Sequence, residues 1–441
     1  MTELVPRLAA HRLHELMGAL RVVVVNGPRQ AGKTTLLRSC HRDLGGEFRT
    51  LDDPDTVATA REDPMSFVQA AERPLVIDEV QRGGDPLVRA VKIAVDEDTS
   101  RGQFVLSGST NFLTVPTLSE SLAGRAGFVE LWPFCVAERA GDDGGFCDQL
   151  FDDPRSLLRR SPWTRDEYID LVCLGGYPEV LEIDSEVGRR GWFDGYLATV
   201  VARDVAGFAQ VHRTQAVPDI LALAAARSGS PFVAADVARA LEMSAVTVRN
   251  YVAYLETVYL LTTVPAWSTN LASKVTKAAK LYLTDSGLAC HLLGADRDAL
   301  RRPGHPALGP LVETFVLAEL RKLLGWTDTA LTVRHFRDRD GREVDVVLEA
   351  RDGRVAAVEA KASASAGADA ARHLHWLRDR LGDRFVAGVV FHLGQTAGSL
   401  GDRVLTLPLS ALWGHARLPG RAAGDGYRTD GTPWSRAPSL W

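Results

Sequence analysis

The stretch Arg21–Leu37, RVVVVNGPRQAGKTTLL, decides the fold of the N-terminal part of this 441-residue chain. Four consecutive valines are typical of a β-strand that is buried on both faces of a parallel sheet. The residues that follow, Gly27–Thr34, fit the pattern G-x-x-x-x-G-K-[ST] and lead into residues that can begin a helix. A strand, a glycine-rich loop and a helix in this order are the context of a phosphate-binding loop. The sequence therefore predicts that the chain binds a nucleoside triphosphate.

The residue types of this loop match the chemistry of a polyphosphate. Glycines let the backbone turn its N–H groups toward phosphate oxygens, and the N-terminus of the following helix adds a favourable dipole. Lys33 can reach the β- and γ-phosphates of ATP, and Thr34 can hold Mg²⁺. The alternative is a glycine-rich turn that binds nothing. We expect the nucleotide to contact Gly27, Pro28, Arg29, Gln30, Ala31, Gly32, Lys33, Thr34 and Thr35.

Composition limits the class of protein. The chain is 46% hydrophobic and 24% charged, as soluble globular proteins are, and its length suggests two or three domains. A net charge of −5 gives no global electrostatic case for nucleic acid, so such binding would need a local basic face. No apolar run approaches the length of a membrane helix. The five scattered cysteines favour free thiols in a reducing cytoplasm.

A second strand ends in the acids that an ATPase needs. The run Leu75–Glu79 reads LVIDE, and parallel strands bring such ends to the edge of the sheet where the phosphate loop lies. Asp78 would support Mg²⁺, and Glu79 would orient or deprotonate the attacking water. An Asp-Glu pair at a strand end is common, so the assignment depends on the phosphate loop.

Two further segments suggest a phosphate sensor and an arginine finger. Phe104–Gly108 is another core strand, and it leads into small hydroxyl residues, of which Ser109 is the first candidate sensor and Ser107 the second. An ordinary Ser/Gly turn is the alternative. Arg125 lies between glycines before a final strand, where it would complete the active site of a neighbouring subunit in a homo-oligomer. The alternative is an ordinary surface arginine, which spacing alone does not distinguish from an arginine finger.

Several motifs occur together in a fixed order. They are GPRQAGKTTLL at 27–37, VIDEVQ at 76–81, SGST at 107–110, LAGR at 122–125, LWPF at 131–134, LGGYPE at 174–179, WFDGYLATVVARDV at 192–205 and KLYLTDSGL at 280–288. With this set, the chain resembles a family of bacterial and archaeal AAA-type P-loop ATPases. The resemblance implies a C-terminal domain of unknown function that is similar to restriction endonucleases.

The middle of the chain indicates a linker followed by helices. Residues 141–165 are rich in Gly, Asp and Pro and predict a linker or a long surface loop, and 166–300 a helical and winged-helix domain. Within it, 231–258 fits a helix-turn-helix with Val246, Val248, Val252 and Leu255 facing inward. DNA would then meet Thr247, Arg249 and Asn250, together with wing lysines at 274, 277 and 280. Such modules also serve as ATPase lids or protein contacts.

The C-terminal part carries a second group of polar residues. Two strands flank the turn Arg351–Gly353, and pairing across it brings Asp345 to within a residue of Glu359. Strand alternation places Glu359 and Lys361 on one face. Two carboxylates and a lysine suit a Mg²⁺-dependent phosphodiesterase, and the resemblance implies that Glu313 is the helix acid of such a site. The alternative is a solvated hairpin face with an ion pair.

These observations predict an α/β protein. The expected parts are a P-loop ATPase (AAA-type) domain at 1–140, the linker, the helical and winged-helix domain, an endonuclease-like α/β domain at 305–412 and a disordered tail at 413–441. We expect a cytoplasmic Mg²⁺-dependent ATPase that is coupled to the processing of DNA or RNA or to defence, with nuclease activity left open. The alternative is an ATP-controlled switch or toxin-like regulator whose C-terminal domain only binds a partner.

Overall fold

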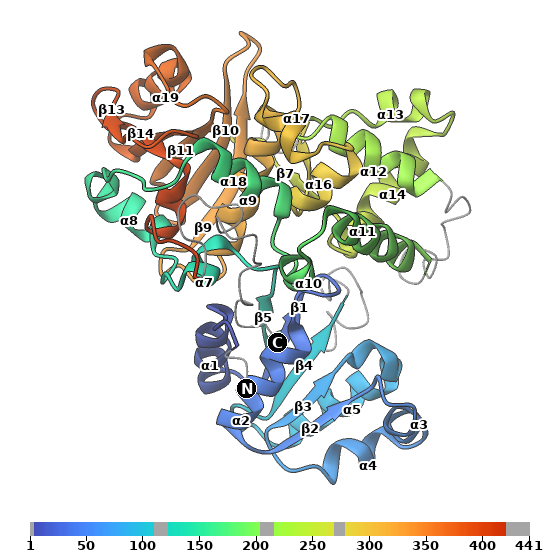
Figure 1. Ribbon diagram of the computed structural model, residues 1–441. Coiled ribbons are helices and arrows are strands. Elements are labelled where there is room, and N and C mark those ends of the chain that lie inside the picture. Colours follow the sequence, from blue (N-terminus) through green and yellow to red (C-terminus); the bar gives the residue numbers. More distant parts are fainter. Residues whose placement is uncertain (1–3, 110–121, 203–215, 269–277, 420–441) are drawn as a thin grey trace, which may run out of the picture. The chain divides into compact units, whose positions relative to one another are not determined.

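The computed structural model describes residues 4–109, 122–202, 216–268 and 278–419 (Figure 1). The chain divides into two compact units, and each is described by itself. One consists of residues 6–133 with 257–259, and the other of 134–256 with 260–441 and the first five residues. No helix among the described residues is long and apolar enough to cross a membrane.

The smaller unit is a three-layer α/β domain built on five parallel strands. The sheet order is β2-β3-β4-β1-β5, in which β4 lies between the strands that carry the phosphate loop and the Asp-Glu pair. The strands are β1 (Val22–Asn26), β2 (Glu47–Thr50), β3 (Leu75–Asp78), β4 (Phe104–Gly108) and β5 (Ala126–Glu130). The helices are α1 (Ala9–Ala19), α2 (Lys33–Leu44), α3 (Pro54–Glu62), α4 (Pro64–Gln69) and α5 (Gly84–Glu97), with the 3-10 turn η1 (Val80–Gly83).

The four valines of β1 explain why this sheet is covered on both sides. All four are fully buried, and alternate side chains point to opposite faces of a strand. Val22 and Val24 pack in the core under α3, α4 and α5, whereas Val23 and Val25 pack in the core under α1 and α2. The prediction of a strand buried on both faces is therefore confirmed.

The larger unit begins with segments that the composition did not predict. They are α7 (Val136–Ala140), α8 (Phe146–Asp152) and η3 (Pro154–Leu157). Phe146, Cys147, Leu150 and Phe151 of α8 are buried, and Phe146 lies 5.6 Å from the ring of Phe391. The linker expected at 141–165 is thus wrong. The glycines and aspartates mark turns around a packed helix, because four apolar residues within seven positions suffice to bury it.

A helical region follows, and its last part has the element order of a winged helix. The helices are α9 (Arg165–Leu174), α10 (Pro178–Glu182), α11 (Glu186–Val200), α12 (Val217–Ala226), α13 (Ala234–Ala240) and α14 (Ala245–Thr257). A small sheet of order β6-β8-β7 completes it, formed by β6 (Ser230–Pro231), β7 (Leu261–Val264) and β8 (Lys280–Leu283). Val248, Val252 and Leu255 are buried as expected, but Val246 is 58% exposed. Val246 and Val248 are two positions apart, and a helix turns such residues to different sides.

The C-terminal part is a mixed six-stranded sheet of order β13-β14-β12-β11-β10-β9. Its strands are β9 (Leu331–Arg337), β10 (Glu343–Ala350), β11 (Val355–Ala360), β12 (Phe385–His392), β13 (Gly398–Ser399) and β14 (Val404–Pro408). Its helical segments are α16 (Ser286–Leu292), α17 (Arg297–Arg301), α18 (Leu308–Leu323), η6 (Ala368–Ala371), α19 (Arg372–Leu381), η7 (Gly382–Arg384) and η8 (Leu409–Trp413). The hairpin expected around Arg351–Gly353 is present, because β10 and β11 pair antiparallel.

The start of the expected disordered tail is also packed. Trp413 is fully buried, its ring lies 5.5 Å from that of Trp163, and the Trp163 indole donates a hydrogen bond to the carbonyl of Ala416. Arg417 pairs with Glu167. The prediction of disorder is therefore wrong for 413–419, where one tryptophan supplies the burial that composition alone did not reveal. Residues 420–441 lie outside the described residues.

Candidate functional site

The predicted phosphate loop joins the carboxyl end of β1 to the N-terminus of α2. Gly27 has φ 156° and Gly32 has φ 91°, values that favour glycine. A Cβ on Gly27 would lie 2.0 Å from the carbonyl oxygen of Leu131, so only glycine fits there. Gln30 also has a left-handed backbone, with φ 62°. Such geometry turns successive N–H groups to one side, as a phosphate cradle requires.

Lys33 is the first residue of α2 and is 5% exposed. Its Nζ donates hydrogen bonds to the carbonyl oxygens of Gly27 at 3.0 Å and Pro28 at 2.8 Å. Both acceptors belong to the loop itself. The ammonium group therefore lies over the loop at the helix N-terminus, where a phosphate would be favoured by both the lysine charge and the helix dipole.

Strand β3, which carries the Asp78–Glu79 pair at its end, meets the phosphate loop, as the sequence predicted. The Thr34 hydroxyl donates to Asp78 Oδ2 at 2.8 Å, and the Ser107 hydroxyl donates to Asp78 Oδ1. Asp78 is 1% exposed. A threonine hydroxyl and a carboxylate in contact at the end of a phosphate loop are oxygen ligands of the kind that Mg²⁺ prefers. These residues therefore fit the metal that accompanies ATP in such sites.

Glu79 follows β3 and has φ 56°, a left-handed conformation that is uncommon for a non-glycine residue. Its backbone N–H donates to Ser107 Oγ at 3.1 Å. Its carboxylate accepts a hydrogen bond from Gln81 Nε2, which also donates to Ser109 Oγ at 3.4 Å. Both candidate sensor serines thus lie beside the acid pair. Gln81 was missed as a site residue, although it stands within the VIDEVQ motif.

Arg125 lies at the amino ends of the strands, whereas its own phosphate loop lies at their carboxyl ends. It precedes the amino end of β5, and its carbonyl accepts a hydrogen bond from the N–H of Val22 at the amino end of β1. Its guanidinium group pairs with Asp96 through Nε–Oδ1 at 2.5 Å and Nη2–Oδ2 at 3.0 Å. In this conformation the guanidinium cannot reach its own nucleotide. Its role toward a neighbouring subunit stays a prediction.

Arg7 is a further residue at the loop that the sequence did not reveal. Its Nη1 donates to the carbonyl of Ala31 at 2.7 Å, and its Nη2 donates to that of Trp132 at 2.6 Å. These contacts join the N-terminal segment to the phosphate loop and to the segment after β5. No local motif marks Arg7, because its partners are backbone carbonyls far away in the sequence.

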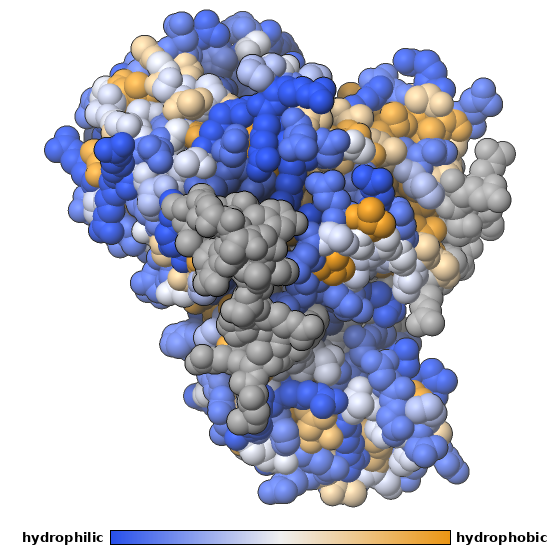
Figure 2. Space-filling model, in the orientation of Figure 1, coloured by the Kyte–Doolittle hydropathy of each residue, from blue (hydrophilic) through white to orange (hydrophobic). Residues whose placement is uncertain are grey.

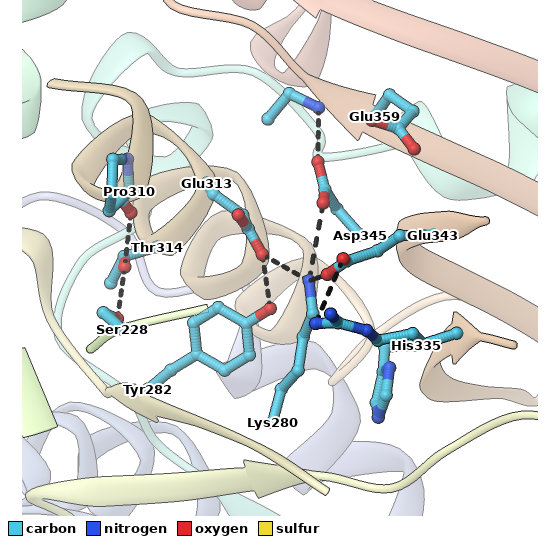
Figure 3. Close-up of polar contacts among 12 residues, drawn as sticks. Ser228, Lys280, Tyr282, Pro310, Glu313, Thr314, His335, Glu343, Asp345 and Glu359 are labelled. Carbon is cyan, nitrogen blue, oxygen red and sulfur yellow. Dashed lines mark hydrogen bonds and ion pairs between the residues drawn. The ribbon is translucent and has the colours of Figure 1, made fainter. Parts of the chain in front are cut away.

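A second polar cluster lies in the larger unit, around the ammonium group of Lys280 (Figure 3). Lys280 Nζ lies 2.9 Å from Glu313 Oε1, 2.7 Å from Glu343 Oε1 and 3.5 Å from Asp345 Oδ1. The Tyr282 hydroxyl donates to Glu313 Oε1 at 2.6 Å. Glu313 comes from α18, the other two acids from β10, and Lys280 from β8. We call Lys280, Glu313, Glu343 and Asp345 the lysine-centred cluster.

The other two predicted residues lie on the neighbouring strand. The pairing of β10 with β11 runs through Val346 and Val358, so one more step in register brings Asp345 opposite Glu359. The backbone N–H of Ala360 donates to Asp345 Oδ2 at 3.0 Å. Lys361 Nζ lies 2.7 Å from Glu359 Oε2, as the alternation of side chains predicts. The structure therefore brings together Glu313, Asp345, Glu359 and Lys361.

Burial and like charges shift the pKa values of these groups. Burial and then the charge of Asp345 raise the pKa of Glu313 to about 7, although Lys280 opposes the shift. The same two causes raise the pKa of Glu359 to about 8, against the effect of Lys361. Burial alone would lower the pKa of Lys280, but the three carboxylates outweigh it and raise the value. Lys280 therefore stays protonated.

The position of Lys280 corrects one sequence prediction. It was expected on a wing that contacts DNA, but the residue is fully buried and faces carboxylates. The sequence alone does not show whether solvent or carboxylates surround the Lys280 side chain. Residues 274 and 277 lie outside the described residues. On α14, Arg249 is exposed and Thr247 and Asn250 are half-buried, so this face remains a candidate for contact with nucleic acid.

Comparisons with known proteins agree with this geometry. A family described as an AAA domain matches residues 20–140. Two domains of unknown function, DUF8612 and DUF4143, match residues 165–299 and 308–412. Together with the phosphate loop and its acid pair, the AAA match defines the smaller unit as an AAA-type P-loop ATPase, which binds and hydrolyses ATP.

Two curated relatives come from mycobacteria. They are Uncharacterized protein Rv2008c of Mycobacterium tuberculosis and Uncharacterized protein Mb2031c of Mycobacterium bovis, each 30% identical over 344 residues. The alignment covers 78% of this chain and 71% of either relative. The chain therefore belongs to the family of these mycobacterial proteins, and its own AAA domain precedes two domains of unknown function.

Solved structures align with lower similarity. The Walker-type ATPase PABY2304 of Pyrococcus abyssi aligns with a TM-score of 0.37 and 14% identity, covering 64% of this chain and 94% of that protein. The RuvB Holliday junction branch migration motor of Thermotoga maritima aligns with a TM-score of 0.28 and 21% identity, covering 58% and 89%. The assignment of the chain depends on the AAA match and the mycobacterial relatives.

Proposed function

We propose that this chain is a cytoplasmic Mg²⁺-dependent ATPase that couples ATP hydrolysis to the processing of nucleic acid. The C-terminal domain would have an endonuclease-like fold and act on DNA or RNA. The observation that carries the first part is the contact of Thr34 with Asp78 beside the phosphate loop. The convergence of three acids and Lys361 near β10 and β11 supports the second part.

Each residue of the ATPase site has a proposed role. Lys33 would bind the β- and γ-phosphates, while Thr34 and Asp78 would hold Mg²⁺, which neutralises charge on the phosphates when it is bound. Glu79 would orient and deprotonate the attacking water, with Gln81 fixing its carboxylate. Ser107 would respond to the γ-phosphate through its contacts with Asp78 and Glu79, and Ser109 through its contact with Gln81.

We further propose that the ATPase acts as a homo-oligomer. Arg125 lies at the sheet edge away from its own phosphate loop, so an arginine finger at this position would have to serve a neighbour. Mixing Arg125→Ala subunits with Glu79→Gln subunits tests this role, because composite sites with one intact set of residues should regain activity. A wild type that is monomeric with ATP and fully active would refute the proposal.

For the C-terminal domain, Glu313, Asp345 and Glu359 are the proposed metal ligands, and Lys361 would stabilise developing charge. The test is cleavage of labelled DNA and RNA in the presence of ATP and Mn²⁺, comparing wild type with Lys361→Ala. Cleavage by wild type alone would support the nuclease. If neither protein cleaves in any nucleotide state, the nuclease assignment fails.

A second candidate is an ATP-controlled switch whose C-terminal domain only binds a partner. The observation that favours it is Lys280, whose ammonium group lies among the acids that a nuclease would use. In Figure 2 the visible surface of the larger unit is mostly hydrophilic, with apolar residues in small separate patches. A partner on that face would therefore be recognised mainly by polar and charged contacts. ATP-dependent binding of a partner by a wild-type protein that cleaves neither DNA nor RNA would favour the switch.

A further inference from the structure

The lysine-centred cluster has the form of a cation site whose cation is supplied by the protein. Three carboxylates from α18 and β10 surround one ammonium group, whose side chain is 1% exposed (Figure 3). A charge buried in this way is strongly destabilising unless it is paired. The carboxylates need a cation for the same reason. Lys280 therefore compensates the buried charge of the acids, and the acids compensate the buried charge of Lys280.

The neighbouring residues hold Lys280 in this place. It begins β8, which pairs with β7 along its length, and Tyr282 two residues later donates a hydrogen bond to Glu313. Gly229 lies directly against the same carboxylate. Its φ is +78°, and a Cβ there would lie 2.8 Å from both oxygens of Glu313. The winged-helix part of this unit is thus shaped to bring a lysine to the acids of the C-terminal sheet.

The cluster offers the ligands of a divalent metal ion, but its centre is taken. Mg²⁺ binds carboxylate oxygens at about 2.0–2.1 Å. Lys280 Nζ occupies the comparable position among three carboxylates, at 2.7–3.5 Å. An ammonium group and a metal ion cannot share this position, because they would overlap and repel each other. In the conformation described here, no group of three or more His, Cys, Asp and Glu side chains within the described part of the chain is arranged to hold a metal ion.

A second observation comes from Glu359, the acid on the neighbouring strand. The side chain of Glu359 is 6% exposed, and its Oε2 forms an ion pair with Lys361 Nζ. Oε1 is buried and has no hydrogen-bond partner in the part of the chain that the structure describes. A buried carboxylate oxygen without a partner is costly and calls for an explanation. A cation that binds Asp345 and Glu359 together would satisfy it.

We propose that Lys280 is a built-in cation that keeps a divalent metal ion out of the acid cluster formed by Glu313, Asp345 and Glu359. In the conformation described here the C-terminal site is closed, and withdrawal of the ammonium group would open it to metal. This inference deepens the proposed nuclease function, because the closed acids are the ones that such a nuclease would use. The exclusion of metal by Lys280 does not itself require that the site cleaves nucleic acid.

The test uses the full-length chain with Mn²⁺ alone as the probe. Lys280→Met keeps the length of the side chain and removes its charge, so the variant should bind Mn²⁺ and wild type should not. Mn²⁺ at ten times its dissociation constant should raise the melting temperature of Lys280→Met by about 3 °C, reversibly with EDTA. Paramagnetic resonance of free Mn²⁺ measures the binding directly.

Lys322 provides a matched control within the same unit. It is 4% exposed, and its Nζ lies 2.8 Å from Glu319 and 3.0 Å from the carbonyl of Phe134. Lys322→Met therefore also removes a buried lysine, but one whose ion pair is with a single carboxylate, that of Glu319. It should lose stability without gaining Mn²⁺ binding. Lys280→Arg retains a cation at the cluster and should remain closed to Mn²⁺.

The outcomes separate this inference from the nuclease proposal. Equal Mn²⁺ binding by wild type and Lys280→Met, or no binding by either, would overturn the role of Lys280. Metal binding by Lys280→Met without cleavage of labelled DNA or RNA would support the role of Lys280 and count against the nuclease. If Lys280→Met does not fold, Lys280→Met/Glu343→Gln carries one unpaired charge fewer, retains the three acids of the proposed site and should show the same gain.

Discussion

Lys33 in the smaller unit and Lys280 in the larger unit are both buried lysines, but the groups that they contact are different. Lys33 donates to two carbonyl oxygens of its own loop, whereas Lys280 lies among three carboxylates. Carbonyl oxygens are dipoles, and a phosphate, which carries full charges, competes well for the ammonium group. The three carboxylates around Lys280 carry full charges themselves, so a phosphate does not compete well for its ammonium group. The same side chain thus suits recruitment of an anion in one place and neutralisation of anions in the other.

The largest effect is expected at Lys33 and Glu79. Glu79→Gln should retain ATP binding but reduce turnover by about 10²–10⁴-fold, because the amide keeps the shape and cannot act as a base. Lys33→Ala should instead lose affinity, because the charge that faces the phosphates is gone. Binding of a fluorescent ATP analogue and steady-state ATPase rates distinguish the two variants. An equal loss of affinity in both would refute the role assigned to Glu79.

The next effect compares Lys280 with Lys361 in metal-free buffer. Lys280→Met should lower the free energy of unfolding by about 3–5 kcal/mol, because it leaves buried carboxylates without their cation. Lys361→Met should cost less than Lys280→Met, since the Lys361 side chain is 38% exposed and pairs with one buried acid, Glu359, rather than with three. Chemical denaturation followed by fluorescence measures both values. Similar losses in the two variants would mean that burial does not distinguish these lysines.

A smaller effect is expected at Gln81. Gln81→Leu removes the hydrogen bonds to Glu79 and Ser109 while it preserves the volume of the side chain. The turnover number should fall by about 10-fold with little change in KM, since positioning of the base affects the chemical step rather than binding. Gln81→Glu, which loses the donor, should behave similarly. A change in KM alone would assign Gln81 to nucleotide binding.

The last expected effect is a dependence of stability on pH. The pKa values of Glu313 and Glu359 are raised to about 7 and about 8, so the folded protein holds these protons more tightly than the unfolded chain. Their contribution to stability is complete below about pH 4.5 and is lost as the pH rises through 7 to 8. The facing groups Lys280, Lys361 and Tyr282 stay protonated in this range because their pKa values are raised. Among the neighbouring acids, Asp345 contributes most to raising both pKa values.

Glu359→Gln is the variant that checks this dependence. An amide does not titrate, so the loss of stability between pH 5.5 and pH 8.5 should be smaller in Glu359→Gln than in wild type. Urea unfolding in the presence of EDTA provides the measurement. An unchanged slope in the variant would assign the dependence to other groups.

Local patterns were sufficient where the chemistry lies within one short segment. The valines of β1, the glycines of the phosphate loop and the hairpin around Arg351–Gly353 are each specified by neighbouring residues. Their outcomes follow from backbone sterics and from burial on two faces. The meeting of Thr34 with Asp78 was also predictable, because parallel strands deliver their carboxyl ends to one edge of the sheet.

Contacts between distant segments could not be read in this way. Lys280 was assigned to a wing because a lysine near a helix-turn-helix looks the same whether solvent or carboxylates surround it. Residues 141–165 looked like a linker because glycines and aspartates hide the few apolar positions of α8. Arg7 lies in no motif, and Gln81 lies within the VIDEVQ motif without a pattern that shows its contact with Glu79.

The sequence by itself determined the P-loop ATPase, since the loop, its strand and its acid pair obey strict local rules of sterics and charge. Only the tertiary structure decided that the acids of the C-terminal sheet meet an internal lysine. That outcome depends on packing between β8, α18 and β10, whose residues lie far apart along the chain. The energy of a buried charge is set by the partners that packing brings within a few ångströms, and no local pattern encodes them.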